Sequence, residues 1–159
     1  MGKILAIAAV GPDGVMGKEG HLPWHYPDDL QHFDRSTRGH VAIMGYNTYL
    51  SLPRRMIDER TCLVLSKKHS INEPHVTTLS DVAYLHPFLQ KTNFVIGGGA
   101  IFKLFFDRRL IDEAWITHIH KSYAGDTYFP TDQLTSWDQH LYRENEDFSI
   151  IYYKRCHGS

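Results

Sequence analysis

Cysteine is scarce, no hydrophobic run is long, and neither sign of charge dominates in this chain of 159 residues. Its two cysteines, Cys62 and Cys156, lie in strand-like segments without CxxC spacing, so we expect buried thiols rather than a disulfide or metal site. No stretch approaches the roughly 20 apolar residues that span a bilayer, and the first residues are too few for a signal peptide. These absences predict a cytoplasmic protein with no membrane partner.

The charge distribution argues against a second class of partner. The formal net charge is −1 and the basic residues are scattered, so no electrostatic footprint for nucleic acid is present. The 11 histidines include His118 and His120 on one face of an expected strand, but no third and fourth ligand follow at a recognisable spacing. We therefore predict no nucleic-acid partner and no metal site, and we expect a monomer.

The alternation of apolar runs with helix-like segments favours an α/β fold. Hydrophobic residues make up 42% of the chain, which is enough for one core, so we expect a single domain over residues 1–159. Short apolar strands separated by helices predict a central, mostly parallel twisted sheet with an antiparallel C-terminal edge and flanking helices. The expected strands are 4–10, 40–44, 62–65, 94–96, 114–120, 139–144 and 148–154, and the expected helices are 27–37, 47–52, 80–89 and 100–106.

Two adjacent acids occupy the first turn of the first expected helix. Pro27 suits the first helical position, and acids in the first turn suit the helix dipole, so Asp28 and Asp29 can both be ordinary helix-start residues. At about 100° per residue, however, Asp29 shares an arc with Leu30 and Phe33, whereas Asp28 falls outside it. A carboxylate on an apolar face needs a partner for its charge or its hydrogen bonds, so we expect Asp29 to meet a cation or a ligand.

Three loops at the ends of expected parallel strands offer groups suited to a phosphate, and open sheets bind ligands beyond such ends. Gly97-Gly98-Gly99 joins a strand to a helix, where it forms either a nucleotide loop or a simple tight turn. Asn47 or Thr48 is expected to cap the helix that follows a second strand. Ser66-Lys67-Lys68 follows a third strand, although lysines in loops are usually solvated surface. An extended dinucleotide would contact several such loops.

Two further features belong near the expected site. Strand alternation puts Thr117 on the same face as Trp115 and Ile119, where its hydroxyl either bonds locally to backbone or meets Asp29 and a polar ligand. Residues 11–20 are rich in glycine and turn residues, which predicts an irregular loop that acts either as a lid or as an ordinary connector.

With these residues the sequence resembles the bacterial dihydrofolate reductases, and the resemblance covers nearly the whole chain. The most specific matches are Leu22-Pro23-Trp24 followed by Asp29-Leu30, and the triple glycine preceded by Val95-Ile96. Further matches occur in order along the chain: Ile7-Ala8-Ala9, Gly17, Pro27, Phe33, Met44-Gly45, Thr48, Leu65-Ser66, Thr117-His118-Ile119, Gly125-Asp126-Thr127 and Phe129-Pro130.

The resemblance implies an oxidoreductase that reduces 7,8-dihydrofolate to tetrahydrofolate for one-carbon metabolism and binds antifolate inhibitors. Hydride would pass from C4 of NADPH to C6 of the pterin, and a proton would reach N5 through water. Asp29 would accept hydrogen bonds from the pterin 2-amino group and N3, with Thr117 supporting it. The resemblance places Leu22 and Trp24 beside these two as catalytic residues. The substrate pocket would be lined by Ile7, Leu30, Phe33, Leu52, Arg54 and Arg60, with Arg60 on the carboxylate of the glutamate tail.

The resemblance also implies an NADPH site at the strand ends, and the mobile lid borders its nicotinamide. In this family the first two glycines are joined by a cis peptide bond. The implied cofactor contacts are Ala9, Val15, Met16, Gly17, Lys18, Glu19, Gly20, His21, Gly45, Asn47, Thr48, Leu65, Ser66, Lys67, Ile96, Gly97, Gly98, Gly99, Ala100, Ile101, Phe102 and Thr127. Tyr46 and Ala100 stand where relatives carry basic residues, so Lys67 or Lys68 would have to compensate at the 2′-phosphate.

Two other functions remain open at this point. A related reductase acting on a pyrimidine intermediate of riboflavin synthesis shares the fold and the glycine loop, but it would not need the segment from Trp24 to Asp29. A noncatalytic nucleotide-binding module would need only the glycine loop and Ser66-Lys67. Such a module does not explain an inward-facing carboxylate together with Thr117.

Overall fold

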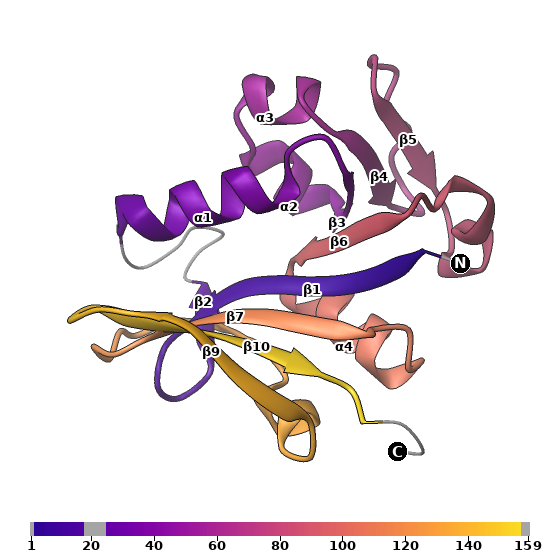
Figure 1. The fold of residues 1–159 in the computed structure, drawn as a ribbon. Helices are drawn as coiled ribbons and strands as arrows, with labels where there is room; N and C mark the ends of the chain where they lie inside the picture. The colour runs from indigo at the N-terminus through magenta and orange to yellow at the C-terminus, as the bar shows by residue number, and fades with distance from the viewer. Residues whose placement is uncertain (1, 18–24, 157–159) are drawn as a thin grey trace.

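The computed structural model describes residues 2–17 and 25–156, which are organised around one eight-stranded sheet (Figure 1). The strand order is β5-β4-β3-β6-β1-β7-β10-β9, and β2 and β8 form a separate two-stranded sheet. The strands are β1 (Lys3–Val10), β2 (Val15–Gly17), β3 (Val41–Gly45), β4 (Thr61–Leu65), β5 (Val76–Leu79), β6 (Thr92–Gly97), β7 (Glu113–Ile119), β8 (Thr127–Tyr128), β9 (Asp138–Glu144) and β10 (Phe148–Lys154).

The direction of the strands confirms the predicted sheet. The strands from β5 through β1 to β7 pair in parallel, and β10 is antiparallel to both β7 and β9. The carboxyl ends of the parallel strands therefore lie along one edge. This edge carries the loops after β3, β4 and β6 that the sequence indicates for a phosphate.

In the described part of the chain, four α-helices flank the sheet: α1 (Pro27–Thr37), α2 (Tyr46–Ser51), α3 (Arg54–Asp58) and α4 (Gly99–Asp107). Figure 1 shows α1, α2 and α3 on one side of the sheet and α4 on the other. None of the helices described is long and apolar enough to cross a bilayer.

Both faces of the sheet are buried, because successive side chains of a strand point to opposite sides. On the α4 face, Ile43 and Val95 pack in one cluster with Phe105. On the opposite face, Ala42 and Met44 pack with helices α2 and α3. A strand buried on both sides reads as a continuous apolar run, which explains why β1, β3, β4 and β6 were recognisable from sequence.

The start of α1 is fixed by Tyr26. Its backbone is extended, its carbonyl accepts hydrogen bonds from the N–H groups of Asp29 and Leu30 at 3.1 Å, and Pro27 follows as the first helical residue. The Tyr26 hydroxyl lies 2.8 Å from that of Tyr123, beyond β7. The Tyr26 ring also packs edge-on against Phe148 of β10, so the first turn of α1, which carries Asp29, is tied to the sheet.

Several predicted elements differ from the structure. The helix expected over residues 80–89 is wrong: two 3-10 turns, Val82–Tyr84 and His86–Phe88, lie there instead. Pro87 lacks an N–H and restricts its neighbour, which prevents a continuous α-helix. The loop expected over residues 11–20 contains the short strand β2, which pairs with β8. The edge strand β5 and the short helix α3 were not expected, since neither has a strong apolar period.

Three smaller expectations are also corrected. Helix α2 begins at Tyr46 with Gly45 as its N-cap, so neither Asn47 nor Thr48 caps it. Cys62 is a buried free thiol in β4, as expected, but Cys156 lies beyond β10 and is only half-buried. A third 3-10 turn, Thr131–Leu134, precedes β9.

The imidazoles expected on one strand face are both engaged in hydrogen bonds. His118 bonds to the hydroxyl of Tyr153 at 2.7 Å. His120, one residue past β7, bonds to Ser149 at 2.8 Å. Over the described residues, no group of three or more potential ligands could hold a metal ion.

The α4 face of the core predicts a large loss of stability on truncation. Phe105 is fully buried, so Phe105→Ala should lower the free energy of unfolding by about 3–5 kcal/mol. Tyr84→Ala is the control, because this ring is 59% exposed and its loss should change stability by less than about 0.5 kcal/mol. Urea unfolding measures both variants, and equal losses would contradict the assigned core.

Candidate active site

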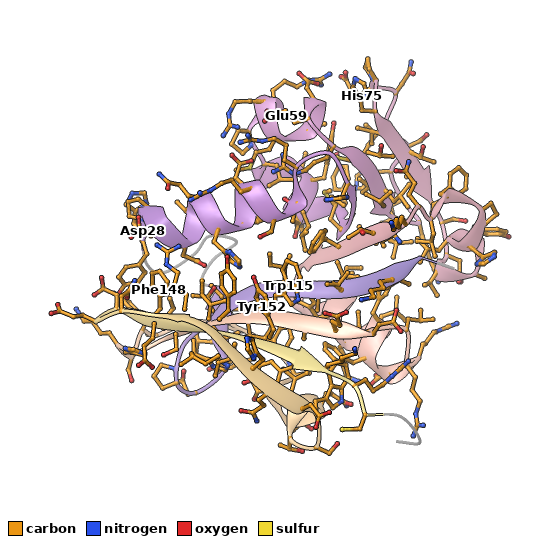
Figure 2. All side chains as sticks on the ribbon, viewed as in Figure 1. Asp28, Glu59, His75, Trp115, Phe148 and Tyr152 are labelled. Atoms are coloured by element: carbon orange, nitrogen blue, oxygen red, sulfur yellow. The ribbon has the colours of Figure 1, made fainter. Side chains whose placement is uncertain are left out.

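Asp29 is a buried carboxylate that meets Thr117. The Asp29 residue is 7% exposed on the first turn of α1, and its carboxylate accepts a hydrogen bond from the Thr117 hydroxyl. Thr117 lies in β7 and is 2% exposed. Asp28, by contrast, is an exposed acid 3.9 Å from Arg143 at the outer end of α1 (Figure 2). The prediction that Asp29 faces the core and Asp28 does not is therefore confirmed.

Burial determines the ionisation of this carboxylate. Loss of hydration raises the pKa of Asp29 above its ordinary value, and the hydrogen bond from Thr117 opposes the rise. Within the described residues, Asp29 has no ion-pair partner. Because its folded-state pKa lies above that of the unfolded chain, ionised Asp29 destabilises the fold. This cost grows as pH rises from about 3.9 through the folded-state pKa.

An aromatic group closes the side of the site beside Asp29. His32, one turn along α1 from Asp29, is 8% exposed and lies against Trp115, Tyr142 and Tyr152. Trp115 and Tyr152 stack at 4.3 Å between α1 and the sheet (Figure 2). Burial and the nearby positive charges of Arg143 and Arg35 lower the pKa of His32, so it is neutral near pH 7. His32 was not predicted from the sequence, because its aromatic partners come from strands more than 80 residues away.

Sheet register brings the expected apolar lining residues onto the face of Asp29. Ala9 pairs with Thr117 and Ile7 with Trp115 across β1 and β7, and Ile7 packs in one cluster with Phe94. Among the residues on the helices, Phe33 and Leu52 are half-buried, whereas Leu30 is 36% exposed. Leu30 thus lies at the rim of the apolar arc rather than inside it, which sharpens the sequence prediction.

The two arginines expected on the substrate tail have protein partners. Arg60 is 4% exposed and its Nη2 lies 2.6 Å from Oδ1 of Asp34 on α1. Arg54 is exposed and pairs with Asp58 and Glu73, each at 3.0 Å. Asp34 is a member of this region that the sequence prediction missed, since nothing in its local pattern marks a partner that lies after α3.

The glycine loop has the cis peptide bond expected from the resemblance, between Gly97 and Gly98. Gly97 has φ of +126°, which favours glycine, and a Cβ on it would lie 3.4 Å from the ring of Phe102. A Cβ built on Gly98 would lie 3.7 Å from Oγ1 of Thr48. No side chain caps the start of α4, so the N–H groups of its first turn are available to an anion.

Other residues that the resemblance assigns to the cofactor lie near the same edge. A Cβ on Gly45 would lie 3.1 Å from Ile101, and one on Gly99 would lie 3.0 Å from Thr127. Val15 packs with Ala9 beside the end of β1. Met16, Leu65 and Ile96 are half-buried, whereas Asn47 and Ala100 are exposed. The other expected residues, Lys18, Glu19, Gly20, His21, Leu22 and Trp24, lie outside the described residues.

The loop after β4 lies against the residue that replaces a basic side chain. The ring of His69 stacks on Tyr46 at 3.9 Å, and the backbone N–H of His69 donates to Ser66 at 3.1 Å. Lys67 and Lys68 are exposed in the same loop. Lys67 and Lys68 therefore directly precede the residue whose ring stacks on Tyr46.

The comparisons with known proteins identify the family of this chain. The family model described as dihydrofolate reductase matches residues 3–155. The chain belongs to the dihydrofolate reductase family. It is 29% identical to the dihydrofolate reductase HdrB of Haloferax volcanii over 167 aligned positions, which cover 96% of this chain and 84% of that protein. It is 32% identical to the dihydrofolate reductase of Staphylococcus aureus over 124 positions, 78% of this chain and 76% of that protein.

A solved structure shows the same fold. The dihydrofolate reductase from Enterococcus faecalis, complexed with NADP(H) and RAB-propyl, superposes with a TM-score of 0.81 at 27% identity. The match covers 96% of each chain. The fold and family expected from the sequence are thereby confirmed for this dihydrofolate reductase-like chain.

The environment of Asp29 predicts an unusual titration. Its carboxyl should titrate above the value of about 3.9 found in exposed peptides, and Thr117→Val should raise this pKa further by removing the opposing hydrogen bond. Carbon-13 NMR of labelled aspartates measures both values. Thr135→Val is the control, because Thr135 is exposed and bonds to Asp132 instead. A pKa at or below the exposed value, or no response to Thr117→Val, would contradict the assigned contact.

Proposed function

We propose that this chain reduces 7,8-dihydrofolate to tetrahydrofolate with NADPH and that Asp29 holds the pterin. The observation that carries the proposal is a buried carboxylate, supported by Thr117, in a chain that matches the family over residues 3–155. NADPH, when bound, supplies a hydride, and the solvent supplies one proton. This proposal is favoured over a pyrimidine reductase or a nucleotide-binding module, because neither needs the paired Asp29 and Thr117.

Asp29 is suited to bind a flat heterocycle that carries adjacent N–H donors. Its two oxygens can accept from the 2-amino group and N3 of the pterin, while Thr117 holds the carboxylate in one orientation. A negative carboxylate in a poorly hydrated position favours a cationic pterin more strongly than it would in water. Asp29 thus raises the share of protonated substrate without touching N5, and water carries the last proton.

The apolar side chains around Asp29 exclude water from the reacting face. Ile7 is 6% exposed, and Phe33 and Leu52 are half-buried. We place the pterin against Ile7 and the benzoyl ring between α1 and Leu52, with Leu30 at the rim. Arg60 is the buried arginine that the resemblance assigns to the carboxylate at the end of the substrate.

The strand-end loops fit a dinucleotide. The glycine loop offers backbone without Cβ atoms next to Thr48, and the uncapped start of α4 offers N–H groups to a phosphate. Ser66 and Lys67 offer a hydroxyl and a positive charge on the neighbouring loop. The cofactor's phosphates would lie along this edge, with Ala9 and Val15 nearer its nicotinamide.

We further propose that the enzyme works in the cytoplasm as a monomer and binds antifolates at Asp29. Diaminopyrimidine-type inhibitors present adjacent N–H donors like those of the pterin, so the same carboxylate recognises them. Sedimentation at micromolar concentration tests the monomer.

The test of the reaction is a spectrophotometric assay with NADPH and dihydrofolate. Asp29→Asn should keep the fold but lose turnover by about a hundredfold or more at pH 7, because a neutral amide cannot favour the cationic pterin. Activity should recover partly in acid, where the substrate is already protonated. Asp28→Asn is the control: it removes the charge of the adjacent exposed acid and should leave turnover unchanged. Undiminished activity of Asp29→Asn at pH 7 would remove Asp29 from its role.

Cofactor preference tests the replacement of basic residues by Tyr46 and Ala100. If Lys67 and Lys68 hold the 2′-phosphate, the double change to Ala should raise the KM for NADPH about tenfold and leave the KM for NADH unchanged, since NADH lacks that phosphate. Lys91→Ala, at the opposite end of β6, is the control. An equal effect on both cofactors, or a wild-type preference for NADH, would show that the lysines do not compensate.

A further inference from the structure

Arg60 is held by the protein on nearly every side. Its Nε donates to Oγ1 of Thr37 at 2.9 Å, and its Nη1 donates to the carbonyl of Met56 at 2.8 Å. Its Nη2 donates to the carbonyl of Asp34 at 2.9 Å and to the Asp34 carboxylate at 2.6 Å. The Arg60 side chain is 1% exposed. A carboxylate from outside therefore meets an arginine whose charge already has a partner.

The Asp34 carboxylate is firmly placed as well. Its other oxygen, Oδ2, accepts from Arg38 at 2.6 Å and lies 3.4 Å from Arg55, and its side chain is 14% exposed. Burial opposes ionisation of Asp34, but the hydrogen bonds and charges of Arg60 and Arg38 outweigh it and hold its pKa below the ordinary value. Asp34 is consequently an anion at neutral pH, fixed by three arginines.

An external carboxylate and Asp34 would compete for the same atoms. Arginine binds a carboxylate best through two parallel N–H groups, and Asp34 occupies both N–H groups of Nη2. Two carboxylates on one guanidinium would repel each other in a poorly hydrated place. These contacts leave one N–H of Nη1, so an incoming carboxylate can form the two-bond contact with Arg60 only by displacing Asp34.

We infer that Asp34 is a specificity-determining residue that occupies Arg60 and suppresses recognition of the glutamate tail of the substrate. This inference rests on the proposed dihydrofolate reductase function and on Arg60 as the tail arginine. The enzyme then selects its substrate by the pterin and benzoyl rings, and the glutamate adds little to binding.

The wild-type enzyme tests this directly with two substrates. The second substrate is 7,8-dihydropteroylamide, which keeps the pterin, the benzoyl ring and the amide but lacks the glutamate. The two KM values should agree within about threefold. A charge-assisted hydrogen bond to the glutamate would instead lower the KM for dihydrofolate by about tenfold or more. A KM for dihydrofolate that is about tenfold or more below that for dihydropteroylamide would overturn the inference. No turnover of either substrate would instead refute the proposed function.

Removal of the internal anion should create tail recognition. Asp34→Asn should lower the KM for dihydrofolate about tenfold and leave the KM for dihydropteroylamide unchanged, because Arg60 then lacks a counter-charge that the tail can supply. Asp34→Glu keeps the charge and should behave like wild type. Asp107→Asn, which removes an exposed carboxylate paired with Lys103, is the control.

Loss of Asp34 also leaves Arg60 without its ion pair and lowers stability, so folding is followed by thermal unfolding. Dihydrofolate should raise the melting temperature of Asp34→Asn more than dihydropteroylamide does, and it should raise that of wild type equally with either ligand. Equal effects of both ligands on Asp34→Asn, or an unchanged KM for dihydrofolate, would overturn the inference. If Asp34→Asn does not fold, the wild-type comparison still decides.

Discussion

The burial of one carboxylate between α1 and β7 is the constraint on which the site depends. Asp29 reaches Thr117 only because Tyr26 ties the first turn of α1 to the sheet and because β7 lies next to β1. The same turn places His32 against Trp115. A carboxylate without a cation raises the free energy of the ligand-free fold when ionised, and a cationic ligand is the partner that removes this cost. Stability and function are therefore opposed at this position.

The parallel sheet brings loops that are distant in sequence to one edge, where a single ligand can contact them. Gly45, Leu65 and Gly97 end three neighbouring strands, so the loops that follow them lie along one edge although more than 50 residues separate the first from the last. Close backbone contacts hold this edge together: Gly45 leaves room for Ile101, and Gly99 leaves room for Thr127. A side chain at Gly45 would press on Ile101 of α4, and a side chain at Gly99 would press on Thr127 of β8, so either change would shift α4 relative to its neighbours.

Sequence reasoning succeeded where a local signal was strong. The buried strands are apolar runs, and α1 has Pro27 at its start and a clear arc, so its bounds matched residue for residue. It failed where tertiary partners decide. The burial of His32 depends on rings from β7, β9 and β10, and the helix expected over residues 80–89 yielded to Pro87. The Asp34–Arg60 pair joins residues 26 apart through no periodic pattern, and a family resemblance carries Arg60 but not the residue that opposes it.

Helix α1 carries a buried carboxylate, Asp29, and a half-buried one, Asp34, in opposite surroundings, and the contrast explains their different roles. Asp29 has a hydroxyl and no cation, so its pKa rises and it is available to a charged ligand. Asp34, five residues on, forms ion pairs with Arg38, Arg55 and Arg60. Burial opposes its ionisation, but the hydrogen bonds and charges of Arg60 and Arg38 outweigh burial and lower its pKa, so its charge already has partners. One helix can therefore bind the cationic pterin through Asp29 in its first turn and, through Asp34, keep Arg60 from binding the anionic glutamate tail. Selectivity for the ring system over the tail follows from that arrangement of charge.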